Sequence, residues 1–119
     1  MQYSFKNMMD IGGILIGNDK PCYIIAEIGI NHNGDIALAK KLIDVATNAG
    51  ANAVKFQKRD LESIYQQKIL ENPSLDSQGT EILIDVLKNV EFGEDDFQDI
   101  VNYCKEKKLP FFAHLGTYQ

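Results

Sequence analysis

Short apolar runs alternate with amphipathic segments along the chain, and Gly, Asn and Asp residues stand between them. The run at residues 22–30 is almost continuously apolar, which is typical of a strand buried on both faces of a parallel sheet. Residues 31–34 then read Asn-His-Asn-Gly, which is a strong turn signal. Asp35 follows, and aspartate is a favourable residue for capping the start of a helix. The pattern predicts a strand, a turn and the start of a helix, in that order.

The segment at residues 36–49 carries apolar side chains at helical spacing, and Gly50 follows where helices commonly end on glycine. The predicted buried stripe consists of Ile36, Ala39, Leu42, Ile43, Ala46 and Ala49. Together with the next predicted strand, at residues 53–57, this helix completes a βα step of about 30 residues.

The strand at residues 53–57 has two chemically different faces, because successive side chains of a strand point to opposite sides. Val54 and Phe56 occupy one face, and Lys55 and Gln57 occupy the other. If the apolar pair packs against the helices, the polar pair must point away from them.

The rest of the chain continues the alternation less regularly. Residues 58–79 show no clear periodicity beyond a short helix around residues 62–70, and so long an irregular stretch in a compact domain is often functional. Helices are predicted at residues 81–89 and 94–107, and a third apolar strand at residues 109–113. The buried stripe of the longer helix is Phe97, Ile100, Val101 and Cys104.

Glycine-containing breaks within residues 5–19 predict a short antiparallel hairpin before the first βα step. We therefore divide the chain into a hairpin lead-in at residues 1–20 and a domain at residues 21–119. Strands that alternate with helices indicate an α/β fold with parallel strands.

Length and charge narrow the class of protein. The 119 residues suit one compact domain and fall short of the roughly 250 residues of a complete (β/α)8 barrel. A net charge of −5 without a basic cluster argues against nucleic acid as a partner. No apolar run reaches the ~18 residues of a membrane span. Cys22 and Cys104, both expected in the core, lack a CxxC spacing, which favours a reducing, cytoplasmic location.

Two charged residues, Glu27 and Lys55, interrupt the predicted apolar strands. They lie on consecutive strands, so they could approach each other at the carboxyl ends, where α/β enzymes place their active sites. Glu27 could also be a solvated residue at a strand end, and Lys55 a charge that reaches water along its stem or pairs with a structural carboxylate. The sequence leaves these alternatives open.

Other polar residues near these strand ends also have two interpretations. Gln57 could hydrogen-bond a polar substrate or be solvated. Asn31, His32 and Asn33 either form the turn or face a ligand at the start of the helix. His32 and His114 have no second ligand at metal-binding spacing, so we expect no metal site in this chain.

The stretches IIAEIGINHNGD at residues 24–35 and AGANAVKFQ at residues 49–57 closely resemble the sialic acid synthase family, and a weaker match continues through residues 87–113. The resemblance implies a (β/α)8 barrel that follows a short hairpin and precedes a small antifreeze-like domain. We expect this chain to supply the N-terminal portion of the barrel, without the antifreeze-like domain, and to end atypically over residues 113–119.

The resemblance also implies a reaction, in which phosphoenolpyruvate condenses with an N-acylated aldose, typically N-acetylmannosamine, and phosphate is released. A divalent metal, Mn²⁺ or Mg²⁺, would assist at the sugar aldehyde, with its ligands outside this chain. By position, Glu27 resembles the catalytic acidic residue, Lys55 the contact to phosphoenolpyruvate and Gln57 the residue that holds the sugar. Asn31, His32 and Asn33 match the family's first βα loop and are expected to bind substrate.

We expect the 119 residues alone to be inactive. Two other interpretations remain open. A partial barrel exposes sheet edges, so the chain could be a non-catalytic module that binds a partner or forms a homo-oligomer. It could also belong to a different phosphate-handling barrel enzyme.

Overall fold

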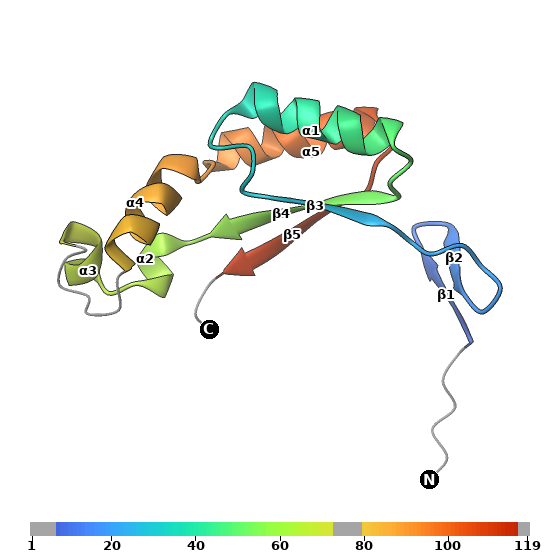
Figure 1. The fold of residues 1–119 in the computed structure, drawn as a ribbon, viewed down its shortest axis with the longest axis horizontal. Coiled ribbons are helices and arrows are strands. Elements are labelled where there is room, and N and C mark those ends of the chain that lie inside the picture. Colours follow the sequence, from blue (N-terminus) through green and yellow to red (C-terminus); the bar gives the residue numbers. More distant parts are fainter. Residues whose placement is uncertain (1–6, 73–79, 117–119) are drawn as a thin grey trace, which may run out of the picture.

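The computed structural model describes residues 7–72 and 80–116, and they form an α/β fold (Figure 1). The strands are β1 (Met8–Ile11), β2 (Ile14–Gly17), β3 (Ile25–Gly29), β4 (Ala53–Arg59) and β5 (Phe111–Gly116). The helices are α1 (Ile36–Asn48), α2 (Leu61–Ile64), α3 (Gln67–Glu71), α4 (Thr80–Val90) and α5 (Glu94–Glu106). The predictions made for residues 5–6, 73–79 and 117–119 lie outside the described ranges. Within those ranges, no helix is long and apolar enough to cross a membrane.

β1 and β2 pair as an antiparallel hairpin in which Ile11 lies opposite Ile14. The tight turn between them is closed by the Gly13 N–H, which donates to Asp10 Oδ1 at 2.9 Å. The hairpin predicted from the glycine-containing breaks is therefore confirmed over its described residues.

A three-stranded parallel sheet in the order β3-β4-β5 forms the centre of the fold. α1 connects β3 to β4, and α5 leads into β5. Figure 1 shows α1 and α5 side by side over the same face of this sheet. The described part of the chain places no helix across the opposite face of the strands.

Several element boundaries differ from the predicted ones. β3 starts at Ile25 rather than at residue 22, so Cys22, expected in the core, lies before the sheet and is exposed. β4 continues to Arg59, and β5 starts only after Pro110, which has no N–H to donate to a strand ladder. The irregular stretch after β4 contains two short helices, α2 and α3, in place of the single one expected.

The core lies between the sheet and the two long helices. Val54 and Phe56 of β4 are fully buried, which confirms the predicted faces of this strand. Ile100 and Cys104 of α5 pack into the same cluster. Ala49, expected in the buried stripe, is instead the exposed C-cap of α1, because the helix ends before it.

Polar contacts join α1 to α5. The Tyr103 hydroxyl donates to Asp44 Oδ1 at 2.8 Å, and Lys107 Nζ lies 3.1 Å from the same oxygen. The hydrogen bond from Tyr103 is the largest cause that lowers the pKa of Asp44, and Lys107 adds to it. A second ion pair, of 2.8 Å, links Lys40 to Asp99. The two connecting helices are thus fastened together as one layer.

Candidate functional site

Glu27 on β3 and Lys55 on β4 lie directly opposite each other in the parallel register. Lys55 Nζ is 3.1 Å from Glu27 Oε2, so the two side chains form an ion pair. The exposed fraction is 39% for the Lys55 side chain and 46% for that of Glu27. The expectation that the two charges approach each other is confirmed, and the pair also reaches water on the face that the helices leave open.

A β-bulge in β3 shapes the space beside this pair, since the register pairs Glu27 with Lys55 but Gly29 with Phe56. Gly29 has a φ of 58°, a conformation that glycine adopts readily. A Cβ atom built on Gly29 would lie 3.4 Å from Glu27 Oε1 and 3.7 Å from Gln57 Nε2. The missing side chain therefore leaves a space that one oxygen of Glu27 and the amide nitrogen of Gln57 both border.

Gln57 is tied to the end of its own strand. Its Oε1 accepts a hydrogen bond of 2.7 Å from Arg59 Nη2. The backbone N–H of Arg59 donates to Glu91 Oε2 at 3.1 Å, and Arg59 Nη1 lies 3.8 Å from Glu91 Oε1. Glu91 belongs to the connection between α4 and α5, and its side chain is only 13% exposed. The carboxyl end of β4 is thus fixed to that connection.

Two polar residues of this edge, Arg59 and His114, were not assigned to the site from the sequence. His114 on β5 lies opposite Gln57 in the register, and paired residues of neighbouring strands share a face. The predicted strand ended one residue before His114, and the predicted form of β4 ended two residues before Arg59. Extending the period of 2 along β4 would have placed Arg59 on the same face as Gln57. The position of His114 depends on the register between β4 and β5, which the sequence alone does not give.

The loop at residues 31–34 is built as a turn around a buried imidazole. The His32 ring stacks on Phe92 with the ring centroids 3.9 Å apart. His32 Nδ1 accepts the Gly34 N–H at 3.1 Å, and burial lowers the pKa of the imidazole. Asn31 and Asn33 are exposed. The turn interpretation is confirmed, and a ligand role for these three polar residues stays a prediction.

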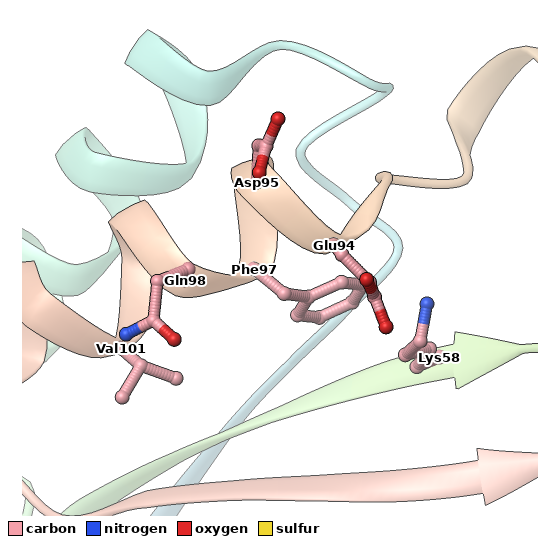
Figure 2. A pocket seen from close by; sticks show the side chains of 6 residues that line it. All are labelled: Lys58, Glu94, Asp95, Phe97, Gln98 and Val101. Atoms are coloured by element: carbon pink, nitrogen blue, oxygen red, sulfur yellow. The ribbon is translucent and has the colours of Figure 1, made fainter.

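Two hollows at the carboxyl end of β4 lie apart from the ion pair. Figure 2 shows the first, of about 440 Å³, where Lys58 points from β4 toward the first turn of α5. Lys58 Nζ is 4.9 Å from the centroid of the Phe97 ring. The second, of about 620 Å³, includes Arg59 and Glu91 in its lining. The ion pair lines neither hollow and instead stands on the open face of the sheet.

The open face combines a cation, a carboxylate and a carboxamide within reach of one another. An ammonium group has three donors, so Lys55 can bind an anion while it faces Glu27. The described residues include no group of three or more His, Cys, Asp or Glu side chains that could hold a metal ion. The arrangement suits recognition of a ligand that carries both an anionic group and uncharged polar groups.

Comparison with known protein families matches residues 42–115 to the NeuB family. The N-acetylneuraminate-9-phosphate synthase of Mus musculus is 40% identical over 103 residues, which cover 85% of this chain and 28% of that protein. The spore coat polysaccharide biosynthesis protein SpsE of Bacillus subtilis (strain 168) is 37% identical over 101 residues, which cover 82% of this chain and 26% of that protein.

Among solved structures, the N-acetylneuraminic acid (sialic acid) synthetase of Leptospira borgpetersenii serovar Hardjo-bovis matches with a TM-score of 0.70 and 34% sequence identity. The match covers 91% of this chain and 34% of that chain. The present chain therefore spans only about a quarter to a third of the length of these relatives.

Proposed function

Because the chain belongs to the NeuB family, we propose that Glu27, Lys55 and Gln57 form part of the substrate site of a sialic acid synthase-type enzyme. Such an enzyme condenses phosphoenolpyruvate with an N-acylated aldose such as N-acetylmannosamine and releases phosphate. The observation that carries the proposal is the 3.1 Å ion pair between Glu27 and Lys55 on the open face of the sheet. A half-exposed ion pair adds little to stability, so ligand binding is the better account of two charges that interrupt apolar strands.

The parallel sheet suits the first part of a (β/α)8 barrel. Its strands follow chain order, and α1 and α5 cover one face only, whereas a doubly wound sheet carries helices on both faces. We assign residues 21–119 to this partial barrel and residues 1–20 to the hairpin lead-in. Barrel enzymes place their sites at the carboxyl ends of the strands, which agrees with the polar edge of β4.

The proposed roles follow from the chemistry of each side chain. Lys55 binds the phosphate or carboxylate of phosphoenolpyruvate as a point charge. Glu27 orients water, or moves a proton, at the oxocarbenium-like centre that forms after the enolpyruvate carbon attacks the aldehyde. Gln57 holds the sugar. The first βα loop supplies the remaining candidates for substrate binding, which are Asn31, His32 and Asn33.

The family resemblance implies a divalent metal, Mn²⁺ or Mg²⁺, at the sugar aldehyde. The described residues form no group of three His, Cys, Asp or Glu side chains that could hold a metal ion, and the resemblance places the ligands of the metal outside this chain. Cys22 and Cys104 are free thiols, and the absence of a bond between them suits the reducing cytoplasm that we propose as the location.

Binding can be tested on the 119-residue chain itself by titrating the ¹⁵N-labelled protein with phosphoenolpyruvate and then N-acetylmannosamine. We expect the backbone amide signals of residues 27–29 and 55–57 to move. Lys55→Ala should abolish the response to phosphoenolpyruvate. Lys105→Ala, in the last turn of α5, should keep it, because that lysine lies on the helix layer. An unchanged response in Lys55→Ala would remove Lys55 from the site.

A second experiment measures turnover by the isolated chain. With phosphoenolpyruvate, N-acetylmannosamine and Mn²⁺, we expect the 119-residue chain alone to release no phosphate, because it spans only about a quarter to a third of its relatives. Clear turnover by the purified chain would contradict this expectation.

The sheet edges support a second candidate function, that of a non-catalytic module that self-associates. β3 and β5 are the outer strands of the described sheet, and each presents an edge without a partner strand. Exposed apolar side chains, Phe112 and Leu115, lie on β5. Sedimentation should then show a homo-oligomer whose population rises with protein concentration. A single monomeric species in sedimentation, together with a cooperative thermal unfolding transition, would count against this candidate.

A further inference from the structure

Arg59 stands between the proposed site and the helical part of the fold. Its Nη2 donates to Gln57 Oε1 at 2.7 Å, and its backbone N–H donates to Glu91 Oε2 at 3.1 Å. A guanidinium group only donates hydrogen bonds. The atom of Gln57 that faces Arg59 must therefore be the oxygen, and the amide N–H groups must point elsewhere.

The amide nitrogen of Gln57 borders a defined space. A Cβ atom on Gly29 would lie 3.7 Å from Gln57 Nε2 and 3.4 Å from Glu27 Oε1. Glu27 Oε2 is the oxygen that pairs with Lys55, so Oε1 is the one that borders the space. A hydrogen-bond donor and an acceptor thus flank the same position, and the donor is in place because Arg59 holds the other end of the amide.

Arg59 is itself held by a buried part of the fold. The Glu91 side chain is only 13% exposed, and it contacts Arg59 through both carboxylate oxygens. The next residue, Phe92, is 5% exposed and stacks on His32. The turn after β3 therefore supports the connection between α4 and α5, and that connection supports Arg59.

We propose, on the basis of the function proposed above, that Arg59 is a positioning residue, which directs the amide N–H groups of Gln57 toward the ligand. Glu91 holds the backbone of Arg59 through its N–H and faces the guanidinium at 3.8 Å. The fork geometry of arginine suits this role, because Nη2 donates to Gln57 while Nη1 faces the Glu91 carboxylate at 3.8 Å. A lysine offers a single ammonium point and cannot hold both partners in the same way.

The first test needs no ligand. The side-chain amide signals of Gln57, recorded on the ¹⁵N-labelled chain, should shift in Arg59→Ala because the hydrogen bond to the amide oxygen is lost. Arg59→Lys should shift them as well, and it keeps a long cationic side chain in case the alanine variant fails to fold. Lys58→Ala should leave them in place, because Lys58 points toward α5 (Figure 2). Unchanged Gln57 signals in the folded Arg59 variants would overturn the proposal.

The second test measures affinity for N-acetylmannosamine in the wild type, Arg59→Ala, Gln57→Ala and the double variant. Loss of one oriented hydrogen bond weakens binding about three- to tenfold. We expect Arg59→Ala to show this loss only while Gln57 is present, since coupled residues are not additive. An equal loss in both backgrounds would mean that Arg59 acts only through stability and would overturn the proposal. If the wild type does not bind the sugar, the proposed function fails, and the Gln57 signals alone decide the role of Arg59.

Discussion

Gly34→Ala is a sharp test of how the turn after β3 packs against α4. Gly34 has a φ of 75°, and a Cβ atom there would lie 2.6 Å from the Asn89 carbonyl oxygen. The left-handed backbone costs an alanine about 1–2 kcal/mol. Overpacking against a neighbour that cannot move freely adds about 1–3 kcal/mol. We expect the free energy of unfolding to fall by the sum of these, about 2–5 kcal/mol.

Gly50→Ala is the matched control, because Gly50 lies at the other end of α1 with a φ of 84°. Apart from its chain neighbours, no described residue places an atom within 4 Å of where a Cβ on Gly50 would lie. The control should lose only the backbone cost of about 1–2 kcal/mol. Urea unfolding followed by circular dichroism gives both values from the shift of the midpoint at constant slope. Equal losses in the two variants would refute the close approach of Gly34 to α4.

Three further predictions concern charge and exposure. Glu27→Gln should change the free energy of unfolding by at most about 1 kcal/mol, since the ion pair is half exposed. A much larger decrease, measured by urea unfolding, would contradict an open face. A thiol reagent at about pH 8 should modify Cys22 in the native protein but Cys104 only on unfolding, because burial raises the pKa of Cys104 to about 11. Rapid modification of both cysteines in the native protein would argue against a packed α5. Burial lowers the pKa of His32 below its ordinary value of 6.5. The neutral imidazole therefore contributes fully to the free energy of unfolding above pH 6.5, the ordinary pKa, and this contribution is lost as the pH falls through the lowered pKa of the folded state. His32→Gln should flatten this part of the pH profile, and an unaltered profile would show that His32 does not titrate differently in the two states.

The sequence could predict the features that depend on the local alternation of apolar and polar residues along a strand or helix. The alternation along residues 53–57 separates Lys55 and Gln57 from the apolar core face, and the structure agrees. Consecutive parallel strands bring the carboxyl ends together, so the meeting of Glu27 with Lys55 followed from the predicted order. These inferences need only the geometry of a strand and the neighbourhood of successive strands.

The features that depend on distant segments could not be predicted. Glu91 meets Arg59 across a long stretch of chain whose pattern gives no sign of where the connection after α4 will pack. The sequence offered His32 only as a turn residue or a ligand contact, and its burial depends on stacking against Phe92, which comes from the same connection. Cys22 has an apolar neighbourhood in the sequence, yet the sheet begins after it. In each case packing decides the environment.

The pairings within the parallel sheet close loops of unequal length. About twice as many residues separate Lys55 from its partner Phe112 on β5 as separate it from Glu27 on β3. Closing a flexible loop costs only about 0.6 kcal/mol more for each doubling of its length. The long segment that carries α2, α3 and α4 therefore adds little entropic cost to the fold. Added length in an exposed part of this connection should therefore cost the fold little, whereas changes at its buried residues, such as Ile84 and Leu87 of α4, should destabilise it through lost packing.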